Sequence, residues 1–223
     1  MSLILNIDSS LENASVSLAE NGEILNFFTN PVQKDHAAFL HTAINELFIL
    51  NDLSPAALDA VACTIGPGSY TGLRVGLAAA KGLVYALNIP LISMGTLNAM
   101  ARTSILKQKN ASDFLYCPLI DARRMEVYTA LYNADTEELV SPHAFVLERS
   151  SFEKKLDLNK IIFFGTGAEK WEKICKHRNA FFTTTPEILY AVNLIGYEKF
   201  ITKRFDDNFL TIPLYTKDFF TGM

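Results

Sequence analysis

The sequence predicts an α/β protein of two lobes that share one internal plan. The first observation is the order strand, strand, strand, helix, strand, helix, which occurs once in residues 1–103 and begins again after them. The second is punctuation at matching places: an aspartate ends the first strand of each half, and a glycine pair follows each fourth strand (Asp8 and Asp121; Gly66/Gly68 and Gly165/Gly167). A repeated unit of this kind predicts two similar sheets, each with its own core.

The first half shows its elements through hydrophobic periodicity and turn residues. Residues 14–20 alternate apolar and polar side chains with the period of two that is typical of a half-buried strand. Asn21-Gly22 predicts a tight hairpin, because both central positions of a type I′ turn need positive φ. Asp35 is the expected N-cap of a helix. The expected elements are strands at 3–8, 14–20, 23–29, 59–65 and 90–93, and helices at 35–50, at 72–87 and from about 96.

The second half repeats this order. Its expected strands lie at 114–121, 125–133, 139–148 and 160–165, and its expected helices lie near 150–156 and from Ala168. A longer helix from Glu187 to about Arg204 is expected to pack back on the first lobe. The predicted organisation is a first lobe at 1–103, a smaller second lobe at 104–186, and a closing helix and tail at 187–223. Duplicated ribonuclease-H-like units are the plan of the actin, Hsp70 and sugar-kinase fold.

Composition places the chain among globular proteins. Of 223 residues, 49% are hydrophobic and 20% are charged. We expect no signal peptide, because the first residues turn polar too early, and no run approaches the ~18 apolar residues of a membrane span. Cys63, Cys117 and Cys175 lie far apart in or beside apolar runs, which favours buried small hydrophobes over a disulfide or metal set. These features predict a protein of the reducing cytoplasm.

The charge is unevenly distributed. The net charge is −4, and residues 1–103 account for all of it, with four basic and eight acidic side chains. This balance does not predict independent binding of nucleic acid. If RNA is involved, other proteins must supply most of the positive surface.

Three segments are candidates for binding a nucleotide or phosphate. The loop from Gly66 to Gly72 lies between a buried strand and a helix start, where free backbone N–H groups favour an anion. Its candidate residues are Gly66, Gly68, Ser69, Thr71 and Gly72. The alternative is a tight turn that needs small residues for packing. The other candidates are the first strand end (Asp8, Ser9, Ser10) and, in the second lobe, Asp121 with Gly165 and Gly167. For Asp8 and Asp121 a plain end-of-strand turn is an equal alternative.

The two long helices of the first lobe carry more apolar and small residues than one core face needs. On the helix at 35–50, one apolar stripe is Phe39, Ala43 and Leu47, and a neighbouring one is Leu40, Ile44 and Phe48. On the helix at 72–87, Gly72, Gly76 and Ala80 would allow another helix to approach closely. Burial inside one lobe and a contact with another protein remain equal alternatives. The four histidines are expected at a helix start and on the surface rather than in a metal site: His36, His41, His143 and His177.

Five segments together resemble the TsaB (YeaZ) family: LNIDSS, KDHAAFL, GPGSYTGLRVGLAAAKGL, DARRMEVY and IPLYTK. These are bacterial partners of TsaD in making threonylcarbamoyladenosine (t6A) at adenosine 37 of tRNA. The chain departs from the family where Arg124 or Met125 replaces a usual glycine and in the Thr-Lys of LYTK (Thr216-Lys217), where the usual arginine is absent.

The resemblance implies a non-catalytic subunit that binds and activates TsaD. At the two positions that carry metal-binding histidines in TsaD, this chain has Thr96 and Met100, which suit a hard metal poorly, so no metal is expected. The family pairs with TsaD through the two helices, and TsaE then docks on the pair. The implied interface residues are His36, Phe39, Leu40, Ala43, Leu47, Gly72, Arg74, Gly76 and Ala80.

The resemblance also implies further ligand and partner properties. No cofactor is expected to bind tightly, with ATP or ADP expected at the junction with TsaD. The chain alone is expected to form a homodimer and to meet tRNA only through the complex. Two enzyme classes are alternatives: a hydrolase of the legacy glycopeptidase label (peptidase M22) and a free-standing kinase. The first lacks a metal or nucleophile signature, and the second lacks an Asp-x-Gly hairpin in each half.

Overall fold

The structure is a computed structural model that describes residues 2–32 and 35–216. The chain forms two compact units, one made of Met1–Thr96 with Leu189–Leu214 and the other of Leu97–Ile188 with Tyr215–Met223. The first boundary therefore lies seven residues before the predicted end of the first lobe, and residue 103 lies inside a helix, α3 (Thr96–Lys107). Within the described residues, none of the helices combines the length and apolarity that crossing a bilayer requires.

The two units have the same sheet topology, which confirms the predicted duplication. The first sheet has the order β3-β2-β1-β4-β5, and the second has the equivalent order β8-β7-β6-β9-β10. In each, the first three strands are antiparallel neighbours and the fourth pairs in parallel with the first. This is the ribonuclease-H-like order. The strands are β1 (Leu3–Asp8), β2 (Ala14–Glu20), β3 (Glu23–Asn30), β4 (Ala60–Gly66), β5 (Leu91–Gly95), β6 (Phe114–Asp121), β7 (Glu126–Tyr132), β8 (Glu138–Val146), β9 (Lys160–Phe164) and β10 (Ala180–Phe182).

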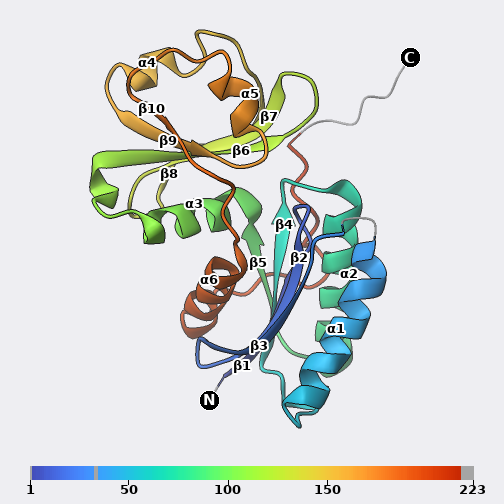
Figure 1. The fold of residues 1–223 in the computed structure, drawn as a ribbon. Coiled ribbons are helices and arrows are strands. Elements are labelled where there is room, and N and C mark those ends of the chain that lie inside the picture. Colours follow the sequence, from blue (N-terminus) through green and yellow to red (C-terminus); the bar gives the residue numbers. More distant parts are fainter. Residues whose placement is uncertain (1, 33–34, 217–223) are drawn as a thin grey trace. The chain divides into compact units, whose positions relative to one another are not determined.

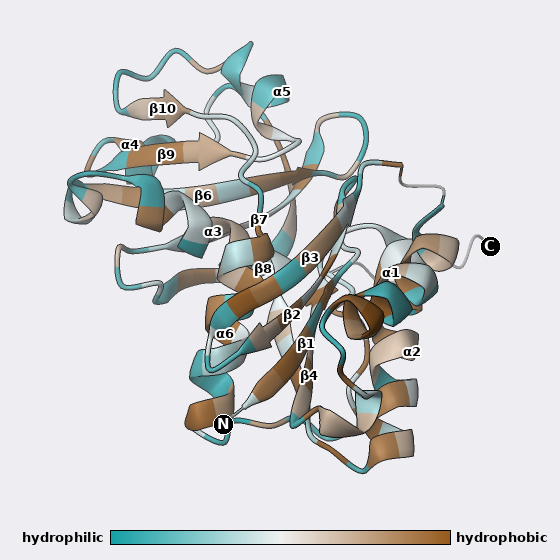
Figure 2. Ribbon diagram, turned by 60° about the horizontal axis from the view of Figure 1, so that its bottom comes forward, coloured by the Kyte–Doolittle hydropathy of each residue, from teal (hydrophilic) through white to brown (hydrophobic). Residues whose placement is uncertain are grey.

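In the first unit, helices cover both faces of the sheet (Figure 1). Helices α1 (His36–Leu50) and α2 (Tyr70–Leu87) lie side by side on one face, and α6 (Leu189–Ile201) lies on the other. Successive side chains of β1 point to opposite faces, so Leu5 and Ile7 join the core under α1 and α2, whereas Asn6 faces α6. Every residue of β1 is therefore buried, and Figure 2 shows hydrophobic residues along it.

The turn predictions have mixed outcomes. Asn21 and Gly22 have φ values of 51° and 86°, which confirms the hairpin expected from this residue pair. Asp35 stands at the N-cap of α1, which confirms its predicted position, but among the described residues its side chain makes no capping hydrogen bond. Helix α2 starts two residues earlier than predicted because Ser69 is its N-cap, with the Ser69 Oγ accepting from the Gly72 N–H at 3.3 Å.

The closing helix packs on the first unit, as predicted, although it spans Leu189–Ile201 rather than 187–204. Asn193 is buried and accepts a hydrogen bond from the Asn6 Nδ2 at 3.3 Å. Its own Nδ2 donates to the carbonyl of Gly22 at 2.7 Å. Near the other end of α6, the Lys199 Nζ donates to the carbonyl of Ser93 at 2.6 Å. These polar contacts set the register of α6 across the sheet.

The segment after α6 returns along the first unit. The Leu214 N–H donates to the carbonyl of Ile65 at 2.7 Å, beside the end of β4. Upstream, the Lys81 Nζ donates to the carbonyl of Phe209 at 3.1 Å, and the Phe209 ring meets Tyr85 edge-on at 6.4 Å. The predicted tail therefore contacts α2 at Phe209 and the end of β4 at Leu214, and residues 217–223 lie outside the described part of the chain.

The second unit has an aromatic core. Trp171 packs against Phe152, Phe163 and Phe182 with ring centroids 4.4 to 5.7 Å apart. Two short helices cover this core, α4 (Glu153–Leu156) and α5 (Ala168–Glu172). Strand β10 was not predicted, because three residues are too few to show a period.

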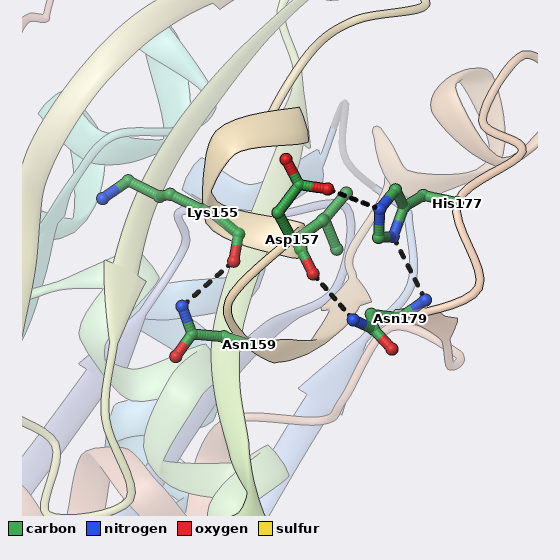
Figure 3. A network of polar contacts seen from close by, with 6 residues as sticks. Lys155, Asp157, Asn159, His177 and Asn179 are labelled. Carbon is green, nitrogen blue, oxygen red and sulfur yellow. Dashed lines mark hydrogen bonds and ion pairs between the residues drawn. The ribbon is translucent and has the colours of Figure 1, made fainter.

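A polar network closes the end of the second sheet where β9 begins (Figure 3). The His177 Nε2 lies 3.3 Å from Asp157, and its Nδ1 accepts from the Asn179 N–H at 3.2 Å. The Asn179 side chain donates to the carbonyl of Leu156 at 2.7 Å. The network links the end of α4 to the segment that leads into β10.

The three cysteines are free thiols. Cys63 and Cys117 are fully buried in the two cores, and Cys175 is half-buried. The predicted role of small hydrophobes is confirmed for the two buried residues.

Candidate functional site

The aspartate at the end of β1 is enclosed by its own unit. The Asp8 side chain is 2% exposed. Its Oδ1 accepts three hydrogen bonds: from the Ser10 N–H at 3.0 Å, from the Ser10 Oγ at 2.6 Å and from the Thr64 Oγ1 at 2.7 Å. Burial raises the pKa of Asp8, and the hydrogen bonds from Ser10 and Thr64 oppose that rise. The carboxyl group therefore ties the first turn to β4.

The glycine loop between β4 and α2 wraps around the main chain of the same turn. The Ser10 carbonyl accepts from the Ser69 N–H at 2.7 Å, and the Ser9 Oγ donates to the carbonyl of Gly72 at 2.7 Å. A Cβ atom at Gly68 would overlap the carbonyl oxygen of Ser10, and one at Gly72 would overlap that of Ser9. Close approach of two backbones thus accounts for both glycines without a ligand. Nucleotide binding at this loop remains a prediction.

The remaining loop residues have different surroundings. Gly66 is buried with a φ of +115°, and a Cβ atom there would lie 3.1 Å from the Leu214 carbonyl oxygen. Thr71 is exposed in the first turn of α2. The loop is therefore covered on one side by the tail that follows α6.

In the second unit, Asp121 occupies the position that corresponds to Asp8. Its Oδ1 accepts from the Arg123 N–H at 2.6 Å and lies 2.7 Å from the Lys170 Nζ. The Asp121 N–H donates to the Thr166 Oγ1 at 3.0 Å. Unlike Asp8, this carboxylate is substantially exposed and is paired with a cation of its own unit.

The second glycine pair repeats the geometry of the first. Gly165 has a φ of +104°, close to that of Gly66, and the Gly167 N–H donates to the carbonyl of Leu119 at 2.8 Å. A Cβ atom at Gly165 would lie 2.7 Å from the Met100 methyl group. Both predicted glycine pairs therefore serve close packing at the end of a fourth strand.

The two positions expected to lack metal ligands are buried. Met100 is fully buried, and its methyl group packs at the Gly165 turn. Thr96 is also fully buried, and its Oγ1 has no hydrogen-bond partner among the described residues. A thioether committed to packing and a single hydroxyl do not make the donor set of a hard metal. Across residues 2–32 and 35–216, no three His, Cys, Asp or Glu side chains are grouped to hold a metal.

Most of the predicted interface residues are core residues of the first unit. Leu40, Leu47 and Ala80 are fully buried, Ala43 is nearly so, and Phe39 is half-buried. The small-residue stripe of α2 faces the sheet for a specific reason. A Cβ atom at Gly76 would overlap the Ser9 Oγ, just as one at Gly72 would overlap the Ser9 carbonyl. These small residues let α2 approach the end of β1, so the interpretation that this stripe faces outward is corrected.

His36 is at the start of α1, as expected, but its side chain is buried rather than exposed. Its Nε2 lies 3.0 Å from the Glu12 carbonyl, while its Nδ1 is buried and has no hydrogen-bond partner in the part of the chain that the structure describes. His41 is exposed, as expected, one and a half turns further along α1.

The outward face of α2 carries a different set of residues, which we call the outer stripe: Arg74, Ala78, Gly82, Tyr85 and Ala86. All five are exposed, and a Cβ atom at Gly82 would meet nothing within 4 Å. Arg74 stacks over the Tyr70 ring at 3.9 Å. The sequence contains this second run of small residues at the spacing i, i+4, but its composition does not tell which run faces the sheet.

Three relatives in sequence point to one pathway. TsaB of Escherichia coli, described as a tRNA threonylcarbamoyladenosine biosynthesis protein, is 30% identical over 182 residues, or 78% of this chain and 75% of the relative. The corresponding protein of Buchnera aphidicola (subsp. Baizongia pistaciae) is 29% identical over 96% of this chain and 98% of the relative. TsaB of Bacillus subtilis is 33% identical over 129 residues, and the match spans 58% of this chain and about half, 54%, of that protein.

A solved structure and a family model agree with these relatives. A Pseudomonas aeruginosa protein described as similar to peptidase YeaZ superposes with a TM-score of 0.82 at 24% identity, over 97% of this chain and all of that one, and so supports the fold. The family model described as TsaD, tRNA N6-adenosine threonylcarbamoyltransferase, matches residues 29–205. The chain therefore belongs to the TsaB (YeaZ) family of tRNA threonylcarbamoyladenosine biosynthesis proteins, within the group that the TsaD family model describes.

Proposed function

We propose that the chain is a non-catalytic subunit of t6A synthesis that binds the transferase TsaD and holds it in its active arrangement. The observation that carries the proposal is the enclosed end of β1. In active members of the actin-like fold the aspartate at this point usually holds a magnesium ion through water. Here the Asp8 carboxyl is 2% exposed and already accepts three hydrogen bonds.

The buried cysteines of the two units and the serines after β1 support the same conclusion. Burial raises the pKa of the Cys63 thiol and raises that of Cys117 to about 12, so neither is a thiolate at neutral pH. A hydrolase would need such a nucleophile or a metal. A kinase would need an open phosphate hairpin, whereas Ser9 and Ser10 are buried under the glycine loop.

The outer stripe of α2 and the neighbouring face of α1 are the contact surface in this proposal. Small side chains at Ala78, Gly82 and Ala86 would let a helix of the transferase approach α2 closely. Tyr85 is 75% exposed and would supply an aromatic anchor of the kind that dominates binding energy in protein interfaces. Helices α1 and α2 would then form half of a four-helix bundle, and TsaE would dock on the assembled pair.

The same face would serve a second copy when the transferase is absent, because a two-fold contact between copies needs only one self-complementary patch. In this proposal nucleotide binds weakly to the chain alone and is held at the junction with TsaD. The tRNA substrate enters the reaction only through the complex.

The test uses three variants in a pull-down with TsaD. Gly82→Arg adds a large charged side chain to the outer stripe but replaces glycine in a helix, so the fold should be kept. It should abolish the pull-down and the homodimer, while Gly82→Ala should retain both. Leu158→Arg adds the same charge at an exposed position of the second unit and is the matched control. Retained TsaD binding by folded Gly82→Arg would refute this contact surface.

The activity arm asks whether the chain itself transforms substrate. The chain alone should form no t6A on tRNA in a mixture in which the transferase components form it, and it should raise the t6A yield when it is added to those components. Nucleoside mass spectrometry measures both. Product formation by the chain alone would overturn the non-catalytic assignment.

A further inference from the structure

The turn that joins β6 to β7 holds two consecutive arginines in an unfavourable backbone conformation. Arg123 and Arg124 have φ values of +74° and +46°. In this region the Cβ atom of an L-residue crowds the following carbonyl, so glycine, asparagine and aspartate are the usual residues. Two bulky side chains at adjacent positions therefore work against the conformation of the turn.

Nothing in the described part of the chain compensates for this cost through the side chains. Both arginines are exposed, and within residues 2–32 and 35–216 neither guanidinium forms a hydrogen bond or ion pair. The Asp121 carboxylate, two residues before Arg123, lies 2.7 Å from the Lys170 Nζ and accepts from the Arg123 backbone N–H at 2.6 Å. Lys170 also donates to the Glu126 carbonyl at 3.2 Å, which fixes it at the base of the turn.

The turn itself is well anchored, so the guanidinium groups extend from a fixed base. The Glu126 N–H donates to the Arg123 carbonyl at 3.0 Å, and the Ala122 N–H donates to the Glu126 carbonyl at 3.0 Å. Because the anchoring bonds are all main-chain, glycine could replace both arginines without losing one of them. Unfavourable backbone positions that persist in a fixed loop are a feature of binding sites.

The chemistry of the two side chains selects the ligand. A guanidinium presents a planar fork of N–H donors that matches a phosphate oxygen pair, and it stays charged at any physiological pH. Adjacent side chains at a hairpin tip spread apart, which suits successive phosphates of a nucleic-acid backbone.

We propose that the Arg123–Arg124 turn is an RNA contact that binds phosphates of the tRNA substrate. The identity of the RNA rests on the proposed function, whereas the phosphate chemistry rests on the turn alone. The contact would position tRNA without reading its sequence, since phosphate contacts carry no base information.

The test is fluorescence anisotropy of labelled tRNA with the purified full chain at salt concentrations from 50 to 200 mM. The Arg123→Gly/Arg124→Gly double variant removes both charges and suits the backbone better. Loss of two phosphate contacts should lower the slope of log affinity against log salt by about 1.8. Between 50 and 200 mM salt, the tRNA affinity of the parent chain should therefore fall by a factor about 12 times larger than that of the double variant.

A charge-matched control is available in the same unit. Lys176→Ala/Arg178→Ala removes two exposed charges beside the start of β10, at the opposite end of the second sheet from the turn. It should keep the parent slope. The glycine variant should melt at or above the parent temperature, since no main-chain bond is lost.

Each other outcome would contradict the proposal. If the parent binds no tRNA at 50 mM salt, or if the glycine variant keeps the parent's salt slope, the turn does not contact RNA. A lower melting temperature assigns the arginines a structural role. If the glycine variant loses TsaD in the pull-down instead of tRNA, the turn is a protein contact. Failure of the proposed function can be told apart from failure of the RNA contact, because in the first case the parent chain would not bind TsaD in the pull-down.

Discussion

Three glycines of α2 provide a direct test of which face of this helix is packed. Gly72, Gly76 and Gly82 lie on one helix, and each can be replaced by alanine. In a helix interior this replacement is worth about 1 kcal/mol in favour of alanine. Their tertiary surroundings differ, so the three substitutions should have different effects on the free energy of unfolding.

At Gly82 the added methyl group meets nothing within 4 Å. Gly82→Ala should therefore stabilise the first unit by about 1 kcal/mol, which for a chain of this size raises the melting temperature by roughly 2–4 °C. At Gly76 the methyl group overlaps the Ser9 Oγ, which must turn away from the Gly72 carbonyl. Leaving buried groups unpaired costs about 1–3 kcal/mol, so Gly76→Ala should destabilise by up to about 2 kcal/mol after the helix gain.

At Gly72 the added methyl group overlaps the main-chain carbonyl of Ser9, and no side-chain rotation can relieve the clash. The turn after β1 must shift together with its hydrogen bonds to Asp8. Gly72→Ala should therefore cost about 3 kcal/mol or more, within the range of strongly disruptive substitutions.

The assay is urea unfolding followed by circular dichroism, with calorimetry for the melting temperatures. A double-mutant cycle isolates the contact at Gly76. In a Ser9→Ala background, the alanine at position 76 meets the Cβ atom of residue 9 and the Ile7 Cγ2, each at an ordinary contact distance of 3.6 Å, so its cost should vanish. Equal effects of the three alanines, or a persistent cost of Gly76→Ala without the Ser9 hydroxyl, would show that this packing argument is wrong.

Three further predictions concern the titration of Asp8, the metal content of the protein and its nucleotide affinity. Burial raises the pKa of Asp8 above 3.8, so the free energy of unfolding should fall as the pH rises from 3.8 through the folded-state pKa. Asp8→Asn should lack this fall in urea unfolding. A stability difference between the parent and Asp8→Asn that does not change with pH would contradict the prediction. Elemental analysis of protein purified without chelator should find well under one zinc, iron or magnesium per chain, given Thr96 and Met100; a full equivalent would contradict that. Calorimetry should give a nucleotide dissociation constant no tighter than roughly 0.1 mM, about −5.5 kcal/mol, for the chain alone, and nanomolar binding would show a complete site.

Local signals predicted much of the fold. Both halves were identifiable because strands alternate with a period of two and because glycine marks sharp turns. The Asn21-Gly22 hairpin is an example, since the residues that suit positive φ stand where the structure requires them. The repeated order of elements then determined the topology of both sheets, and the motifs in the glycine loop were specific enough to indicate the family.

The tertiary structure decided which residues face outward. Helix α2 has small residues on two faces, and only the approach of the turn after β1 shows that Gly76 is packed while Gly82 is free. The role of Asp8 depended in the same way on Thr64, which is 56 residues away in sequence. Sequence periodicity records that a face is small or apolar, but whether that face is covered depends on contacts between segments far apart in the chain. The strained conformation of Arg123 and Arg124 was likewise visible only in the tertiary structure, because the hairpin that imposes it is closed by strands on either side.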